Sequence, residues 1–363
     1  MFRAGADRLA RSDLLPTSLR AVLGHYADAG VFDWGSLRLK RRVDAVTEAM
    51  IDDAFAAVEA ELEAEFGRES VSFSYDTKLV LPAQLTLGYH YRRLDGDDRD
   101  RAEELTRLAI EALVDGDMRD AINDDEFEDF EVDFDPGDRR RVAKLAQATL
   151  EERVEAGFAA FPDGVREAYD RAVEASQAHQ AEDDHFRELM AATRGEPAGG
   201  DRPEKLDPAR ARERIHTEYR DADFEEQPDL FTREELSLPY FKTQYDRVGV
   251  IYDGMIEMYC RAGLPVEDAF RKSIVLAIVG AQVWLDDVDD YERDMRDGQL
   301  TPVTAEYLLA DSGQAAHDCV VAVAERYLGL AADRAQAAES PLTGIATEYI
   351  YRSGNPEKLP GAE

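Results

Sequence analysis

The chain has few cysteines, few lysines and no long apolar run. Only Cys260 and Cys319 are cysteines among its 363 residues, so neither a disulfide framework nor a zinc site of paired cysteines is expected. Of its 43 basic residues seven are Lys, which leaves 36 Arg. The longest apolar run, Ile274 to Leu285, contains Gly and Gln and is too short to span a bilayer, so no stable membrane span is expected.

Acidic residues dominate the composition. The chain has 78 Asp and Glu residues and a formal net charge of −35. This excess is typical of halophilic proteins, in which concentrated cations screen the self-repulsion, so most surface carboxylates need no ligand to explain them. It also argues against a nucleic-acid partner, because phosphate binding depends on Lys and Arg patches. The first residues lack the apolar stretch of a signal peptide, and we expect a cytoplasmic protein.

Apolar residues recur at three- and four-residue steps along most of the chain, which predicts an all-α fold. The clearest case is a long helix from Trp34 to Phe66, ended by Gly67. Further helices are expected over residues 75–94, 98–122, 142–161 and 165–192, in a hairpin of 239–263 and 265–297, and as two or three helices over 303–352.

These helices predict one large bundle over residues 34–352. Residues 1–33 form an N-terminal lead-in with a short helix near Leu19 to Tyr26, and residues 353–363 form a C-terminal tail. The Gly, Pro and charge content that begins at Arg194 predicts a mobile loop at about residues 194–230. This loop would be either a disordered connection or a lid over a site, and residues 207–220 within it predict a short polar helix.

An acidic stripe ends the most apolar of these helices. At about 100° per residue, Asp286, Asp290, Asp294 and Asp297 fall at roughly 0°, 40°, 80° and 20°, and Asp287 at roughly 100°. Clustered carboxylates oppose each other's ionisation unless a cation neutralises them, and Mg²⁺ prefers such oxygen ligands, often shared with substrate phosphates. The stripe therefore predicts a Mg²⁺-diphosphate site beside an apolar wall. The alternative is a solvated, salt-adapted helix end.

The same stretch resembles a motif of a known family. Gly280, Gln282, the Asp286-Asp287-x-x-Asp290 run, Asp294 and the Gly298-Gln299-Leu300-Thr301-Pro302 turn resemble the second aspartate-rich motif of the class I isoprenoid synthases, although Gln282 stands one residue further from the Asp pair. Upstream, Lys242-Thr243 resembles the Lys-Thr pair of that family, whose Lys binds diphosphate. The resemblance covers about residues 240–302. It implies the single large helical bundle of the terpenoid synthase type.

By this resemblance, other parts of the chain would complete a diphosphate site. Lys78 and Pro82 resemble a basic family helix that serves a second diphosphate, and Arg139 and Arg140 stand where the family has paired arginines. Gln282 and Thr243 would join them as substrate-binding residues. The family's first aspartate-rich motif has only imperfect candidates, which are Asp117 with Asp120, then Asp124 with Asp125, and then the later run Glu182-Asp183-Asp184 beside His179 and His185.

The resemblance implies a Mg²⁺-dependent enzyme that ionises an allylic prenyl diphosphate and transfers the prenyl group to isopentenyl diphosphate. Asp286, Asp287 and Asp290, with Asp294, would hold Mg²⁺, and Lys242 would help to neutralise the leaving diphosphate. Prenyl diphosphates would be the small-molecule partners, and a homodimer would fit. The alternatives are a terpene cyclase or a head-to-head synthase of the squalene or phytoene type, a non-catalytic homologue or partner subunit, and an acid-rich bundle without a site.

Overall fold

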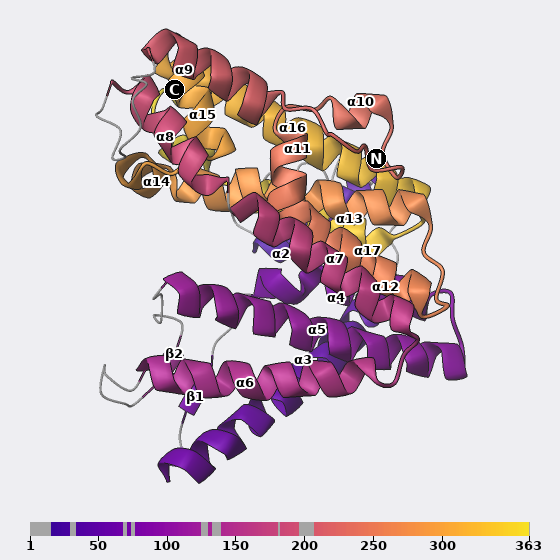
Figure 1. Ribbon diagram of the computed structural model, residues 1–363. Helices are drawn as coiled ribbons and strands as arrows, with labels where there is room; N and C mark the ends of the chain where they lie inside the picture. The colour runs from indigo at the N-terminus through magenta and orange to yellow at the C-terminus, as the bar shows by residue number, and fades with distance from the viewer. Residues whose placement is uncertain are drawn as a thin grey trace. The chain divides into compact units, whose positions relative to one another are not determined.

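The computed structural model describes residues 16–29, 34–67, 71–73, 77–124, 130–132, 139–180, 182–195 and 207–362. The chain divides into two compact units. Unit 1 comprises residues 1–32, 170–254 and 267–363, and unit 2 comprises residues 33–169 and 255–266. Helices make up nearly all of the described secondary structure (Figure 1), so the prediction of an all-α fold is confirmed. None of the described helices is both long and apolar enough to cross a membrane.

Unit 2 contains four long helices: α3 (Trp34–Phe66), α4 (Thr77–Tyr91), α5 (Asp97–Asp124) and α6 (Arg139–Phe158). Helix α3 has the predicted bounds, and its buried face follows the three- and four-residue steps of Val43, Thr47, Met50, Ala54, Val58 and Leu62. Strands β1 (Val71–Phe73) and β2 (Phe130–Val132) pair antiparallel, with Val71 opposite Val132. This short pair was not predicted, because residues far apart in the chain form it.

The helices over residues 17–29 and 163–220 agree with the sequence prediction in part; residues 163–169 belong to unit 2 and the others to unit 1. Helix α2 (Thr17–Ala29) covers the expected short helix and packs against α17 (Pro341–Ser353). The helix expected over 165–192 is instead divided between α7 (Asp163–Gln180) and α8 (Asp183–Thr193). Within the expected loop at 194–230, the short polar helix predicted over 207–220 is confirmed, as α9 (Pro208–Arg214) followed by the π-helix η1 (Ile215–Arg220). Residues 196–206 of that loop lie outside the described residues.

The remaining elements follow in chain order, and all lie in unit 1 except residues 255–261, which belong to unit 2. They are α10 (Arg233–Leu236), α11 (Phe241–Gln244), the π-helix η2 (Tyr245–Gly249), α12 (Val250–Arg261), α13 (Asp268–Ala281), the π-helix η3 (Gln282–Asp287), α14 (Tyr291–Asp297), α15 (Pro302–Leu309), α16 (Gly313–Ala337), α17 and the short η4 (Pro356–Lys358). Helix α13 packs along α16. The two approach closely at Gly280, where an added Cβ would lie 2.9 Å from Leu328.

An aromatic cluster supports the segment that carries Lys242. Phe241, which is fully buried, packs edge-on against Phe231 with ring centroids 4.8 Å apart, and against Tyr245 and Tyr327 at 5.8 and 6.3 Å. Burial of one such ring stabilises a fold by about 1.5–3 kcal/mol. Helix α11 has only four residues, so this packing, rather than helix propensity, holds it in place.

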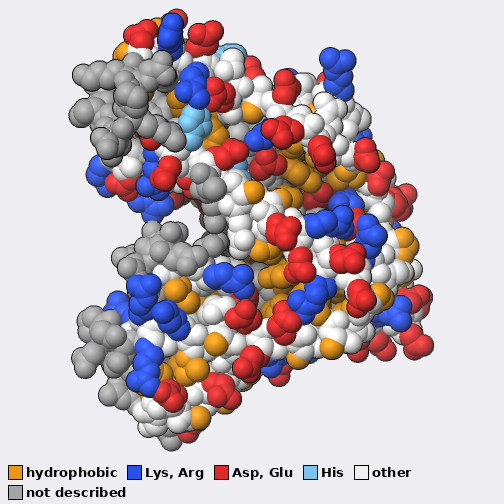
Figure 2. All heavy atoms as spheres, viewed as in Figure 1, with side chains coloured by type: hydrophobic (Ala, Val, Ile, Leu, Met, Phe, Trp, Pro, Cys, Tyr) orange, Lys and Arg blue, Asp and Glu red, His pale blue; other side chains and the backbone are white. Residues whose placement is uncertain are grey.

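The surface fits the acidic composition. Asp and Glu side chains spread across the visible face and alternate with Lys and Arg (Figure 2). Neither Cys260 nor Cys319 forms a disulfide.

Candidate functional site

The acidic stripe lies in unit 1, where the predicted continuous helix is interrupted. The chain passes from α13 into the π-helix η3, bends at Asp290 and continues as α14. The 100° wheel therefore does not hold through residues 282–290. Nevertheless the backbone N–H of Asp290 donates to Asp286 O, and that of Asp294 to Asp290 O, both at 2.9 Å. Because these bonds join residues four apart, Asp286, Asp290 and Asp294 follow one another along one side of the segment.

Two carboxyl groups of this stripe are buried. Asp287 is 3% exposed and Asp294 8% exposed, whereas Asp297 is exposed. Burial, with Asp294 and Asp286 nearby, raises the pKa of Asp287 to about 7 against the opposing effect of Arg247. Burial and Asp290 raise the pKa of Asp294 to about 6. Ionisation of these buried carboxyl groups therefore costs free energy, and a bound cation would reduce that cost.

Gln282 and Trp284 have distinct roles beside the stripe. Gln282 Nε2 donates to Asp287 Oδ1 at 3.3 Å, while Asp287 Oδ2 has no hydrogen-bond partner. Trp284 Nε1 donates to the backbone oxygen of Tyr351 at 2.8 Å, and the two rings stack. Trp284 therefore packs in the core, and Gln282 orients a carboxyl of the stripe.

Lys242 and Thr243 follow a strained residue. Tyr240, which precedes α11, has φ 64° and ψ 5°, a left-handed conformation that costs a non-glycine residue about 1–2 kcal/mol. Its hydroxyl donates to Glu306 Oε1 at 2.9 Å, and Arg220 Nε donates to the same oxygen at 3.0 Å. This buried contact with α15 secures the turn from which Lys242 projects.

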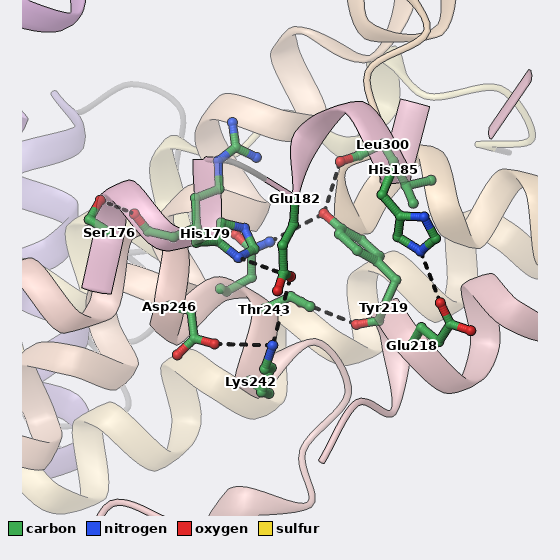
Figure 3. Close-up of polar contacts among 12 residues, drawn as sticks. Ser176, His179, Glu182, His185, Glu218, Tyr219, Lys242, Thr243, Asp246 and Leu300 are labelled. Atoms are coloured by element: carbon green, nitrogen blue, oxygen red, sulfur yellow. Dashed lines mark hydrogen bonds and ion pairs between the residues drawn. The ribbon is translucent and has the colours of Figure 1, made fainter. Parts of the chain in front are cut away.

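The two residues of the Lys-Thr pair make different contacts: Lys242 contacts carboxylates, and Thr243 makes buried hydrogen bonds. Lys242 Nζ lies 3.3 Å from Asp246 Oδ2 and 3.9 Å from Glu182 Oε2 (Figure 3). Thr243 is fully buried, and its hydroxyl donates to the backbone oxygens of Tyr219 and Tyr240 at 3.1 and 3.2 Å. Thr243 thus ties α11 to η1, a structural role that its assignment as a diphosphate ligand did not include.

Arg247 is the central cation that the sequence analysis missed. It lies on η2, five residues after Lys242, and is partly buried. Burial opposes its charge, but Tyr219, Asp287, Asp183 and Asp294 together raise the pKa of the guanidinium. The Asp246-Arg247 pair one turn beyond Lys242 was the available signal, but its partners come from three other segments and could not be read from the sequence.

Each of the three π-helices of unit 1 supplies a residue to this cluster. Tyr219 comes from η1, Arg247 from η2 and Asp287 from η3. Short π-helical turns occur frequently at functional sites, because the wider turn redirects side chains. We therefore take this cluster, with Lys242 and Gln244, as the candidate site.

The least favoured candidate for the first acidic motif lies in this cluster. Glu182 precedes α8 and contacts Lys242, and Asp183 lies close enough to Arg247 to affect its pKa. His179, at the end of α7, is 5% exposed, and its Nδ1 lies 3.9 Å from Glu182 Oε2 (Figure 3). His185 is separate, because its Nε2 pairs with Glu218 at 2.9 Å. The structure thus brings this later run together with the second motif.

The other predicted site residues belong to unit 2. Asp117 and Asp120 lie on α5, Asp124 ends it, and Asp125 lies outside the described residues. Arg139 and Arg140 begin α6, and Lys78 lies in the first turn of α4. The buried carboxylates of α5 are other residues, Glu111 and Asp115, which pair with Arg153 and Arg119 at 2.6 Å.

Carboxylate oxygens at the stripe are the ligand type that Mg²⁺ prefers, and the raised pKa values of Asp287 and Asp294 are consistent with a site for a cation. Across the part of the chain that the structure describes, no three Asp, Glu, His or Cys side chains are already grouped to hold a metal ion. The residues therefore fit the metal in kind, and the side chains would have to turn toward a common point to bind it.

Comparison with known proteins gives no relative. No protein-family model, curated protein or solved structure matches the chain.

Proposed function

We propose that unit 1 binds the diphosphate of a prenyl diphosphate together with Mg²⁺, and that the chain is an isoprenoid diphosphate synthase-like enzyme. The observation that carries the proposal is one cluster of charges, in which Arg247 lies near the buried carboxyl groups of Asp287 and Asp294 and, with Lys242, near His179. Cations beside buried carboxyl groups, one of which has an oxygen without a hydrogen-bond partner, suit a ligand that brings both phosphate oxygens and a divalent ion.

The roles follow from the charges. Asp286, Asp290 and Asp294, spaced along one side of the segment, would hold Mg²⁺ with Asp287. When bound, Mg²⁺ would neutralise charge on the leaving diphosphate. Lys242 would exchange its contacts with Asp246 and Glu182 for a phosphate oxygen, and Gln282 would keep Asp287 oriented. The apolar α13, with Val275 and Val279 fully buried, would exclude water near the reacting carbon.

Transfer to isopentenyl diphosphate is the reaction that we favour, because Lys78 and the Lys242-Thr243 pair resemble residues that serve two diphosphates. A terpene cyclase or a head-to-head synthase would use the same acidic stripe and would need no isopentenyl diphosphate. A non-catalytic homologue would bind diphosphate without turnover. We propose a homodimer as the working assembly.

The test is a turnover assay in molar salt with Mg²⁺, radiolabelled isopentenyl diphosphate and a panel of allylic diphosphates, with EDTA as the control. Label in longer prenyl diphosphates only with Mg²⁺ is the expected result. Hydrocarbon from an allylic substrate alone would indicate a cyclase or head-to-head synthase instead.

The site assignment is tested with Asp286→Ala combined with Asp290→Ala. We expect loss of Mg²⁺-dependent diphosphate binding with an unchanged helical circular dichroism spectrum, while Asp297→Ala, an exposed change on the same segment, binds normally. Equal binding by the double variant and the wild type would refute the assignment.

A further inference from the structure

Three buried polar atoms near Tyr219 have no hydrogen-bond partner among the described residues: Nδ1 of His179, Oε1 of Gln244 and Oδ2 of Asp287. Their side chains are 5%, 0% and 3% exposed. Buried polar atoms in folded proteins are nearly always paired, so each of these needs an explanation. Gln244 Nε2 contacts the Tyr219 hydroxyl at 3.4 Å, and Phe186 packs against both Tyr219 and His179. Asp287 also lies near Tyr219, because its charge contributes to the raised pKa of the Tyr219 hydroxyl.

His179 and Arg247 are held close together. Ser176 precedes His179 by three residues and so shares its side of α7, and Ser176 Oγ donates to the backbone oxygen of Arg247 at 3.4 Å. The contact fixes the last turn of α7 against η2. Within the described part of the chain, the Arg247 guanidinium makes neither a hydrogen bond nor an ion pair shorter than 4.0 Å.

The surroundings of this pair favour an anionic oxygen. Burial, Arg247 and Lys242 lower the pKa of His179 to about 4, so the ring is neutral near pH 7 and carries one N–H donor. Glu182 also faces the ring, but its Oε2 lies 3.9 Å from Nδ1, beyond hydrogen-bond distance.

The two nearby cations differ in how far they are already neutralised. Lys242 lies within 4.0 Å of two carboxylates, Asp246 and Glu182. Arg247 has Asp183, Asp287 and Asp294 nearby without an ion pair to any of them. Arg247 is therefore the cation with donors still available to a ligand.

We propose that the Nδ1–H of His179 and the guanidinium of Arg247 form an oxyanion-binding pair that holds a non-bridging phosphate oxygen of the ligand. The inference rests on the proposed function and deepens it, because it assigns two residues that the family resemblance does not supply. A planar guanidinium and an adjacent N–H suit the tetrahedral oxygens of a phosphate group. The diphosphate could belong to a prenyl ester or be free pyrophosphate, and the test separates the two.

The experiment is calorimetric titration of inorganic pyrophosphate, and separately of geranyl diphosphate, into the full chain in molar KCl with Mg²⁺. His179→Phe keeps the ring that packs on Phe186 and removes both nitrogens, and Arg247→Met removes the charge. We expect each single variant to weaken binding about tenfold or more. The loss of affinity in the double variant should be smaller than the product of the two single losses, because both side chains bind the same oxygen. If only geranyl diphosphate responds, the pair serves the bound ester rather than free pyrophosphate.

Two matched controls sharpen the test. His185→Phe makes the same chemical change on the next helix, where the Nε2 of His185 is paired with Glu218, and should leave affinity unchanged. His179→Asn restores a polar atom near the Nδ1 position and should recover most of the affinity.

A measurement on the wild type avoids dependence on a variant that fails to fold. In protein labelled with ¹⁵N-histidine, pyrophosphate should shift the Nδ1 resonance of His179 and leave that of His185 in place. Wild-type affinity in both His179→Phe and Arg247→Met, or an unmoved His179 resonance at saturation, would overturn the pair while leaving the proposed function intact. Absence of binding by the wild type to either ligand would overturn both.

Discussion

Replacement of Asp287 by Asn should make unit 1 more stable in a way that depends on pH. The carboxyl is 3% exposed, and its pKa rises from 3.8 to about 7 in the folded chain, with burial as the largest cause. The folded state therefore binds this proton more tightly than the unfolded state does. The contribution of this group to the free energy of unfolding is therefore greatest below about pH 4, where the carboxyl is protonated, and it is lost as the pH rises to about 7.

The magnitude follows from the size of the change. A rise from 3.8 to about 7 corresponds to about 4 kcal/mol between the two protonation states. Asn is neutral at every pH and keeps an oxygen for Gln282 Nε2. The Asp287→Asn variant should thus unfold with a free energy up to about 4 kcal/mol higher than the wild type at pH 8, and within about 1 kcal/mol of it at pH 4.

The assay is denaturant unfolding in molar KCl with EDTA from pH 4 to pH 8, followed by the fluorescence of Trp284. The chain has two tryptophans, and the other, Trp34, is 67% exposed, so a Trp34→Phe background isolates the signal of unit 1. Asp297→Asn, an exposed change, is the control and should not alter the pH profile. Parallel profiles for Asp287→Asn and the wild type would refute the reasoning. If the proposed function holds, Mg²⁺ in place of EDTA should narrow the gap at pH 8, because it stabilises the ionised wild type more than a variant that lacks one of the four carboxylates.

Two further outcomes are expected. Glu306, which is 4% exposed, accepts hydrogen bonds from Arg220 and Tyr240, so Glu306→Ala should lower the free energy of unfolding by about 3–5 kcal/mol. Glu306→Gln keeps an oxygen for the Tyr240 hydroxyl and should lower it less. Equal losses in the two variants would show that the charge alone matters. Dialysis from molar salt to low salt should unfold the chain because of its net charge of −35, and an unchanged circular dichroism spectrum would contradict this.

The sequence by itself determined most of the helices and the four-residue spacing of the acidic stripe. Hydrogen bonds between residues about four apart are encoded locally. They account for the bounds of α3, for the three helices after residue 301 and for the spacing of Asp286, Asp290 and Asp294. Residues four apart adjoin on a helix wherever it packs.

Only the tertiary structure decided which of these residues share a site. The burial of Asp287, the approach of Arg247 to Asp183 and the left-handed turn at Tyr240 depend on contacts between segments that are distant in the chain. The π-helices also shift the direction of side chains in a way that a fixed angle per residue cannot follow. Burial and charge interactions depend on the whole packed unit, so the candidate site emerged only when the segments were placed together.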